Sequence, residues 1–137
     1  MKYKVLFSVF FFSAALFSDN KFIAHMVTVP LIEGAGGFAS IACLTRNSRP
    51  HTKAAAAVNL SALGTTVGLG IATLAVKTAK AEKIHRVHKI LGLVVLGSAA
   101  LLSTSVTFDP AVRGTYIAFI TYGYTLFSSI PIIIFKF

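Results

Sequence analysis

HKILGLVVLGSAALLSTSVTF, residues 88–108, is the stretch that decides the fold of this chain. After Lys89 the run contains no charged residue, and about 20 residues are what an α-helix needs to cross a bilayer. Three further apolar runs of similar length cover residues 22–44, 54–76 and 116–135. The connections between them are short, and short connections place consecutive helices antiparallel and side by side. The sequence therefore predicts an all-α integral membrane protein with a four-helix transmembrane bundle.

The composition excludes a water-soluble domain. Apolar residues make up 55% of the chain and charged residues 12%, against about 25% charged residues in soluble domains. The net charge of +9 does not indicate nucleic-acid binding. The basic residues gather between the apolar runs, where they meet anionic lipid head groups instead. We therefore expect a multi-pass protein of an organellar membrane or of the plasma membrane.

A fifth apolar segment precedes the predicted bundle. Residues 5–17 follow two lysines, contain small residues at positions 13–15 and end before the polar sequence SDNK. This pattern is typical of a secretory signal peptide, but a retained signal anchor or a short fifth helix is equally compatible with it. The chain thus divides into this segment, residues 1–20, and a four-helix transmembrane domain, residues 21–137.

A cationic connection leads into the run at residues 88–108. Its basic residues recur at every third position and are Lys77, Lys80, Lys83, Arg86 and Lys89. Clusters of basic residues beside a membrane span bind anionic head groups. We expect this connection to lie at the membrane surface, in contact with such lipids.

Small residues form a stripe along one face of the predicted helix at residues 54–76. The stripe consists of Ala57, Ser61, Gly64, Gly68, Ala72 and Ala75. Gly64 and Gly68 form a GxxxG motif, which allows helix backbones to approach closely in lipid. We expect the stripe to pack against another helix of the same chain. The alternative is a face that binds another membrane subunit.

Two histidines are placed to meet near one membrane surface. The first and third runs are two crossings apart and therefore parallel, and His25 and His88 lie near their starts. Two imidazoles at similar depth can hold a flat cofactor from opposite sides, and Gly92, one turn after His88, leaves room for its ring system. His85 is the alternative ligand on the same helix face. In a competing interpretation, these histidines only cap helix ends near the head groups.

Two other polar residues have different surroundings. Glu33 is the only acid within an apolar run, where a charged carboxylate is costly, so it should be neutral, paired or facing a polar cavity. A proton or ion role is compatible with this position, and so is a hydrogen bond to a neighbouring helix or to a partner subunit. His51 follows Pro50 in a polar connection and is expected to be a solvated surface residue.

The chain resembles the cytochrome b561 family over residues 22–108. The resemblance rests on a histidine that opens the first helix (FIAH, His25), an arginine at its end (Arg46), a lysine before the second helix (Lys53), and the motif from His88 to Gly92, followed by LVVLG. Members of that family are four-helix membrane proteins that pass electrons between two b haems. The resemblance therefore implies a b-type haem whose iron is bound by His25 and His88.

The second haem of that family has no ligands in this chain. The family holds it between histidines of the second and fourth helices, whereas residues 54–76 and 116–135 contain none. Ala56 and Asn59 occupy the positions where the first of these histidines would be sought. No CxxCH motif is present, so any haem is non-covalent. The sequence thus implies at most one b-type haem and no other cofactor.

Two functions are compatible with these features. The first is a single-haem electron-transfer protein, and the second is a non-catalytic accessory subunit of a larger respiratory or photosynthetic membrane complex. A carrier or channel built around Glu33 is a third interpretation. The sequence contains no nucleophile–base pair, phosphate-binding loop or paired carboxylates, so a hydrolase or transferase has no support.

Overall fold

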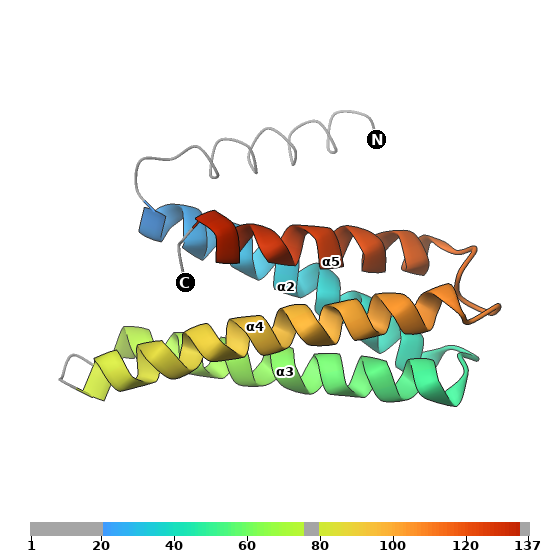
Figure 1. Ribbon diagram of the computed structural model, residues 1–137, viewed down its shortest axis with the longest axis horizontal. Coiled ribbons are helices and arrows are strands. Elements are labelled where there is room, and N and C mark those ends of the chain that lie inside the picture. The colour runs from blue at the N-terminus through green and yellow to red at the C-terminus, as the bar shows by residue number, and fades with distance from the viewer. Residues whose placement is uncertain (1–20, 76–79, 135–137) are drawn as a thin grey trace.

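The computed structural model of the protein describes residues 21–75 and 80–134. These residues form four long helices (Figure 1), namely α2 (Lys21–Thr45), α3 (Pro50–Ala75), α4 (Lys80–Thr107) and α5 (Tyr116–Ile134). Each helix contains an apolar segment long enough to cross a membrane. The predicted all-α, multi-pass membrane protein is therefore confirmed. The predicted signal peptide or fifth helix, at residues 1–20, lies outside the described residues.

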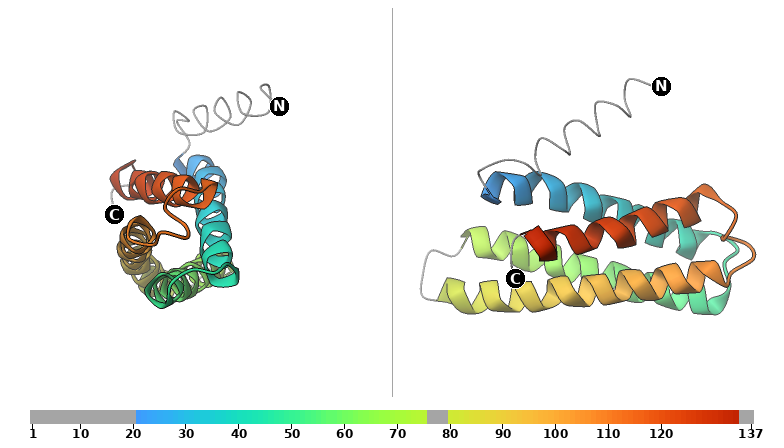
Figure 2. Two further views of the ribbon diagram at one scale, coloured as in Figure 1. Left: turned by 90° about the vertical axis from the view of Figure 1, so that its right-hand side faces the viewer. Right: turned by 45° about the horizontal axis from the view of Figure 1, so that its top comes forward.

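The four helices form a closed ring around the interior. Helix α2 packs against α3 and α5, and α4 packs against the same two helices. The end-on view in Figure 2 shows α2 and α4 at opposite corners of this ring. The chain reverses its direction between α2 and α3 and again between α3 and α4. Helices α2 and α4 are therefore parallel, and their first turns lie at the same end of the bundle.

Helix α4 begins earlier than the sequence predicts. Residues 80–87 were expected to belong to the cationic connection, but they are helical and extend α4 by two turns. Lysine, alanine and glutamate favour helix, and Glu82 lies 4.0 Å from Arg86 across one turn. Lys83 and Arg86 are exposed on this extension. Contact of these cations with anionic lipids stays a prediction.

The outer face of the bundle is apolar on every helix. Large side chains are among the most exposed residues, including Phe119 at 80% and Ile133 at 71%. A monomeric soluble protein rarely exposes apolar surface on this scale. The outer face therefore has the chemistry of a surface that lipid tails cover.

The small-residue stripe of α3 belongs to this outer face. Ala57, Ser61, Gly64 and Gly68 are exposed, and a Cβ atom added at Gly64 or Gly68 would meet no described atom within 4 Å. The prediction that the stripe packs against another helix of the same chain is therefore wrong, at these positions, for the helices that the structure describes. The physical reason is that α3 turns its larger polar residues, Asn59 and Thr66, into the bundle instead. A face that binds another subunit stays a prediction.

A buried hydrogen-bond network joins the four helices at mid-length. Asn59 of α3 donates from Nδ2 to the Ser40 hydroxyl of α2 at 2.9 Å. Its Oδ1 accepts from the Ser98 hydroxyl of α4 at 2.8 Å and from the Tyr124 hydroxyl of α5 at 3.1 Å. Asn59 is fully buried. It therefore satisfies its own amide while linking one residue from each of the other three helices.

The end of the bundle that carries the α2–α3 and α4–α5 connections is filled by apolar side chains. A core cluster there consists of Cys43, Ala55, Ala56, Leu102, Val106, Val112, Ile117 and Ala118. Ala56 and Asn59, where a ligand of a second haem was sought, are both fully buried in protein contacts. The interior at this end is occupied by the chain itself.

Asp109 fastens the two connections at this end. Its carboxylate is fully buried and accepts hydrogen bonds from the backbone N–H of Arg49 at 2.8 Å and of Ala111 at 3.0 Å. The Arg49 carbonyl accepts the first helical bond of α3, from Lys53, and Pro50 follows Arg49 as the first helical residue. Asp109 thus holds the start of α3, where the helix dipole favours a negative charge.

The stability of the protein should depend on the ionisation of Asp109. Burial raises the pKa of Asp109, but the hydrogen bonds from Arg49, Thr52 and Ala111 and the nearby His51 outweigh burial, so the pKa lies below its ordinary value of 3.8. The stabilisation is then fully present above pH 3.8 and is lost as the pH falls through the lower folded-state pKa. We expect Asp109→Asn to lower the free energy of unfolding by about 1–3 kcal/mol at pH 7. The difference from wild type should shrink as the pH falls below 3.8.

Unfolding of detergent-solubilised protein, followed by circular dichroism at pH 7 and at pH 3, measures this effect. Glu82→Gln is the matched control, because the Glu82 side chain is 85% exposed. A constant difference between wild type and Asp109→Asn at both pH values would contradict the prediction.

Candidate functional site

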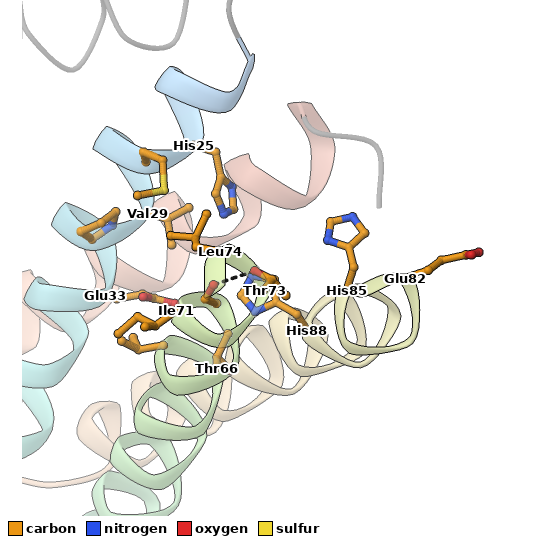
Figure 3. A pocket seen from close by; sticks show the side chains of 14 residues that line it. His25, Val29, Glu33, Thr66, Ile71, Thr73, Leu74, Glu82, His85 and His88 are labelled. Atoms are coloured by element: carbon orange, nitrogen blue, oxygen red, sulfur yellow. Dashed lines mark hydrogen bonds between the residues drawn. The ribbon is translucent and has the colours of Figure 1, made fainter. Parts of the chain in front are cut away.

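His25 and His88 meet across the interior of the bundle. His25 lies in the second turn of α2 and His88 in the third turn of α4, and both are half-buried. Their ring centroids are 6.2 Å apart and their ring planes are inclined at 78°. Figure 3 shows the His25 side chain reaching from α2 toward His88. The two predicted iron ligands thus come together from diagonally opposite helices.

A cavity of about 520 Å³ opens beside this pair. It lies between α2 and α3, with the first turns of α4 at its mouth. Its walls are mainly apolar, and its volume is within the range of ordinary ligand pockets. The lining residues are His25, Met26, Val29, Pro30, Glu33, Thr66, Val67, Gly70, Ile71, Thr73, Leu74, Glu82, His85 and His88.

A smaller cavity of about 40 Å³ lies against the same pair and reaches α5. Five residues line both cavities, namely His25, Val29, Glu33, Thr66 and His88. Gly92 and Tyr124 line only the smaller one. The predicted place of Gly92, beside the histidines, agrees with this lining. The histidine pair therefore borders both cavities, and the larger one offers the space for a group held by both rings.

The His88 ring packs against Gly70 of α3. A Cβ atom added at Gly70 would lie 3.2 Å from Cε1 of His88, so glycine leaves the space that this ring occupies. Nδ1 of His88 is buried and has no hydrogen-bond partner among the described residues. Buried polar atoms are normally satisfied. A hydrogen bond to a bound molecule, or a bond to a metal, would satisfy this one.

His85, the alternative ligand, has a different position. It lies one turn before His88 on α4, is exposed, and lines the mouth of the larger cavity together with Glu82. Figure 3 shows His85 farther from His25 than His88 is. His51 lies at the other end of the bundle, exposed in the first turn of α3. The prediction of a surface residue is confirmed, although His51 is part of a helix and not of a connection.

Glu33 is half-buried and lines both cavities. Among residues 21–75 and 80–134, no group donates a hydrogen bond to its carboxylate or forms an ion pair with it. The anticipated hydrogen bond to a neighbouring helix is thus not formed within this part of the chain. Figure 3 shows Glu33 pointing from α2 into the space beside Thr66. Glu33 thus faces a cavity, and a hydrogen bond to a partner subunit stays a prediction.

Three site residues could not be recognised in the sequence. Thr66 and Gly70 of α3 and Tyr124 of α5 line or shape the cavities. Gly70 is one of the chain's 10 glycines, and no motif distinguishes it. Tyr124 lies over Gly36 of α2, which has no side chain to displace the ring. Both glycines, Gly36 and Gly70, leave space for a side chain of another helix. Such a contact can be recognised only when the arrangement of the helices is known.

The described residues hold no group of three His, Cys, Asp or Glu side chains that could bind a metal ion by themselves. The arrangement they do offer is a facing pair of imidazoles beside apolar cavities. Fold and site together define a multi-pass membrane protein with an interior histidine pair and, within residues 21–75 and 80–134, four candidate spans. Comparison of the chain with protein-family models, with curated proteins and with solved structures gives no match.

Proposed function

We propose that the protein holds one non-covalent b-type haem between His25 and His88 and transfers electrons in its membrane. The distance between the two rings carries this proposal. An imidazole nitrogen binds a metal at about 2 Å, and the ring centroid lies roughly 1 Å behind it, so two rings on opposite sides of one iron have centroids about 6 Å apart. The observed separation is 6.2 Å.

The surroundings of the pair fit a flat apolar group. The cavities of about 520 and 40 Å³ both border the histidines, and the larger one has walls of Met26, Val29, Ile71 and Leu74. His88 also offers a buried nitrogen without a partner among the described residues. The exposed His85 at the cavity mouth would act as a polar neighbour, not as an iron ligand.

A haem held by two imidazoles supplies a one-electron carrier whose iron has no open position for oxygen. His25 and His88 would fix its position and orientation, and the apolar walls would exclude water. The likeness of residues 22–108 to the cytochrome b561 family supports the same function. A relay through a second haem is not part of the proposal, because α3 and α5 contain no histidine within their membrane spans apart from the exposed His51.

Absorption spectroscopy of the purified protein tests the proposal. We expect a reduced-minus-oxidised difference spectrum of the b type, with about one haem per chain by extraction and a six-coordinate, low-spin ferric form. The protein should be produced with haem supplied to the expression host. An intact, folded protein that stays colourless after haem is supplied would overturn the proposal.

A second candidate function is that of a non-catalytic subunit of a larger membrane complex. The outward position of Gly64 and Gly68 on α3 favours it, because small residues on a lipid-facing surface allow a foreign helix to approach. The same spectrum separates the two candidates. A colourless chain that is degraded when produced alone and stable in its native membrane would favour the subunit function.

A further inference from the structure

Glu33 is the one acidic residue that lies deep inside a membrane span of the described chain. The other acid within a span, Glu82, lies at the very start of α4 and is exposed to solvent. Glu33 is two helical turns from His25, roughly 12 Å along the axis of α2 at 1.5 Å per residue, and both residues line both cavities. Its carboxylate therefore faces the same space as the histidine pair.

The charge of this carboxylate has no compensation from the described residues. No hydrogen-bond donor and no cationic side chain among them contacts Glu33. An uncompensated charge inside a membrane span is strongly unfavourable. Glu33 should therefore be ionised only while a positive charge is present nearby and should bind a proton when that charge is removed.

The iron and the porphyrin ring of a ferric haem together carry one positive charge, and in the ferrous form they carry none, because the ring contributes two negative charges. In a site of low dielectric constant, such a charge acts strongly on a neighbouring ionisable group. Reduction would thus remove a positive charge near Glu33 that no described residue replaces. This step rests on the proposed haem function.

We propose that Glu33 is the proton acceptor coupled to reduction at the histidine pair. One electron from an external one-electron donor reduces the ferric centre to ferrous, and one proton from water converts the Glu33 carboxylate to a carboxyl group. The net charge of the site is then unchanged. On oxidation, Glu33 releases the proton to water while the electron passes to a one-electron acceptor.

The other titratable groups that face this space belong to α2, α4 and α5. Helix α2 contributes His25, α4 contributes Glu82, His85 and His88, and α5 contributes Tyr124. Helix α3 lines the space with uncharged residues. His25 and His88 would be bound to iron, and Glu82 and His85 lie at the open mouth. Of the titratable groups that line the larger cavity, Glu33 is thus the one that would neither bind iron nor lie at the mouth.

A redox titration at several pH values tests the proposal on the whole protein. We expect the midpoint potential to fall as the pH rises, with a slope that approaches about 59 mV per pH unit for one proton and one electron. A haem protein whose potential does not change with pH would overturn the role of Glu33 and leave the haem function standing. A protein without haem would instead overturn the proposed function itself.

The variant Glu33→Gln should keep the b-type spectrum and lose the slope. The reduced-minus-oxidised infrared spectrum of the wild type should contain the carbonyl stretch of a protonated carboxyl group, and this band should be absent from Glu33→Gln. Glu82→Gln is the matched control and should retain both the slope and the band. If Glu33→Gln does not fold, Glu33→Asp replaces it and should keep a slope over a displaced pH range. A slope that persists unchanged in Glu33→Gln would overturn the proposal.

Discussion

His88→Ala is expected to abolish the b-type absorption spectrum of the purified protein. The His88 ring is fixed by its contact with Gly70 and by the opposite ring of His25, 6.2 Å away between centroids. Without it, an iron bound by His25 has a single protein ligand and an enlarged cavity around it. We expect the haem content per chain to fall by more than about tenfold, equivalent to at least roughly 1.4 kcal/mol of binding free energy. His25→Ala should have the same effect.

His51→Ala and His85→Ala are the matched controls. Both residues are exposed, and both should be replaceable without loss of the spectrum. Rescue separates a lost ligand from a misfolded chain, since free imidazole added to His88→Ala can enter the space left by the side chain and should restore a six-coordinate spectrum. Full retention of the wild-type spectrum by both His25→Ala and His88→Ala would rule out the pair as the ligands.

The number of spans could be predicted because the bilayer imposes their length and composition. Four runs of about 20 apolar residues leave few alternatives, and the structure has a helix in each. The start of α4 could not be predicted in the same way. Residues 80–87 carry five charged or basic side chains, so the apolar run that marks the membrane span ends at a point where the helix continues. Local helix propensity and the Glu82–Arg86 pair decide that boundary.

The face of α3 that turns toward the interior could not be predicted from the sequence. A small-residue stripe indicates that something can approach the helix closely, but it does not say whether that partner belongs to the same chain. The fully buried Asn59 decides the question, because its amide makes three hydrogen bonds, all of them to side chains inside the bundle. The glycines on the opposite side are then turned outward.

The sequence could predict that His25 and His88 lie close together, because they stand near the starts of two parallel spans at one membrane surface. The cavities could not be predicted. They arise from the combined shapes of side chains on α2, α3 and α4, and from Gly70, whose missing side chain admits the His88 ring. Packing detail of this kind depends on the rotation of each helix about its axis. Helical periodicity alone leaves that rotation open when every face of the helix is apolar.

Asn59→Ala is expected to destabilise the bundle by about 2–4 kcal/mol. The substitution removes three buried side-chain hydrogen bonds, with Ser40, Ser98 and Tyr124. Hydrogen bonds between membrane helices contribute about 0.6 kcal/mol on average and up to roughly 1.7 each, and the substitution takes from the buried Tyr124 hydroxyl the amide oxygen to which it donates. Unfolding by a denaturing detergent, titrated into the solubilised protein, measures the loss.

Ser61→Ala is the control on the same helix. Its hydroxyl donates to the Ala57 carbonyl of its own turn and lies on the exposed face, so its removal should change stability by less than about 0.5 kcal/mol. The contribution of one helix pair follows from a double-mutant cycle of Asn59→Ala with Tyr124→Phe, for which we expect a coupling energy of about 0.6–1.7 kcal/mol. Equal unfolding midpoints for Asn59→Ala and Ser61→Ala would mean that the network does not hold the four helices together. Tyr124 also lines the smaller cavity, so a real coupling would show that the network fixes one wall of the histidine site as well.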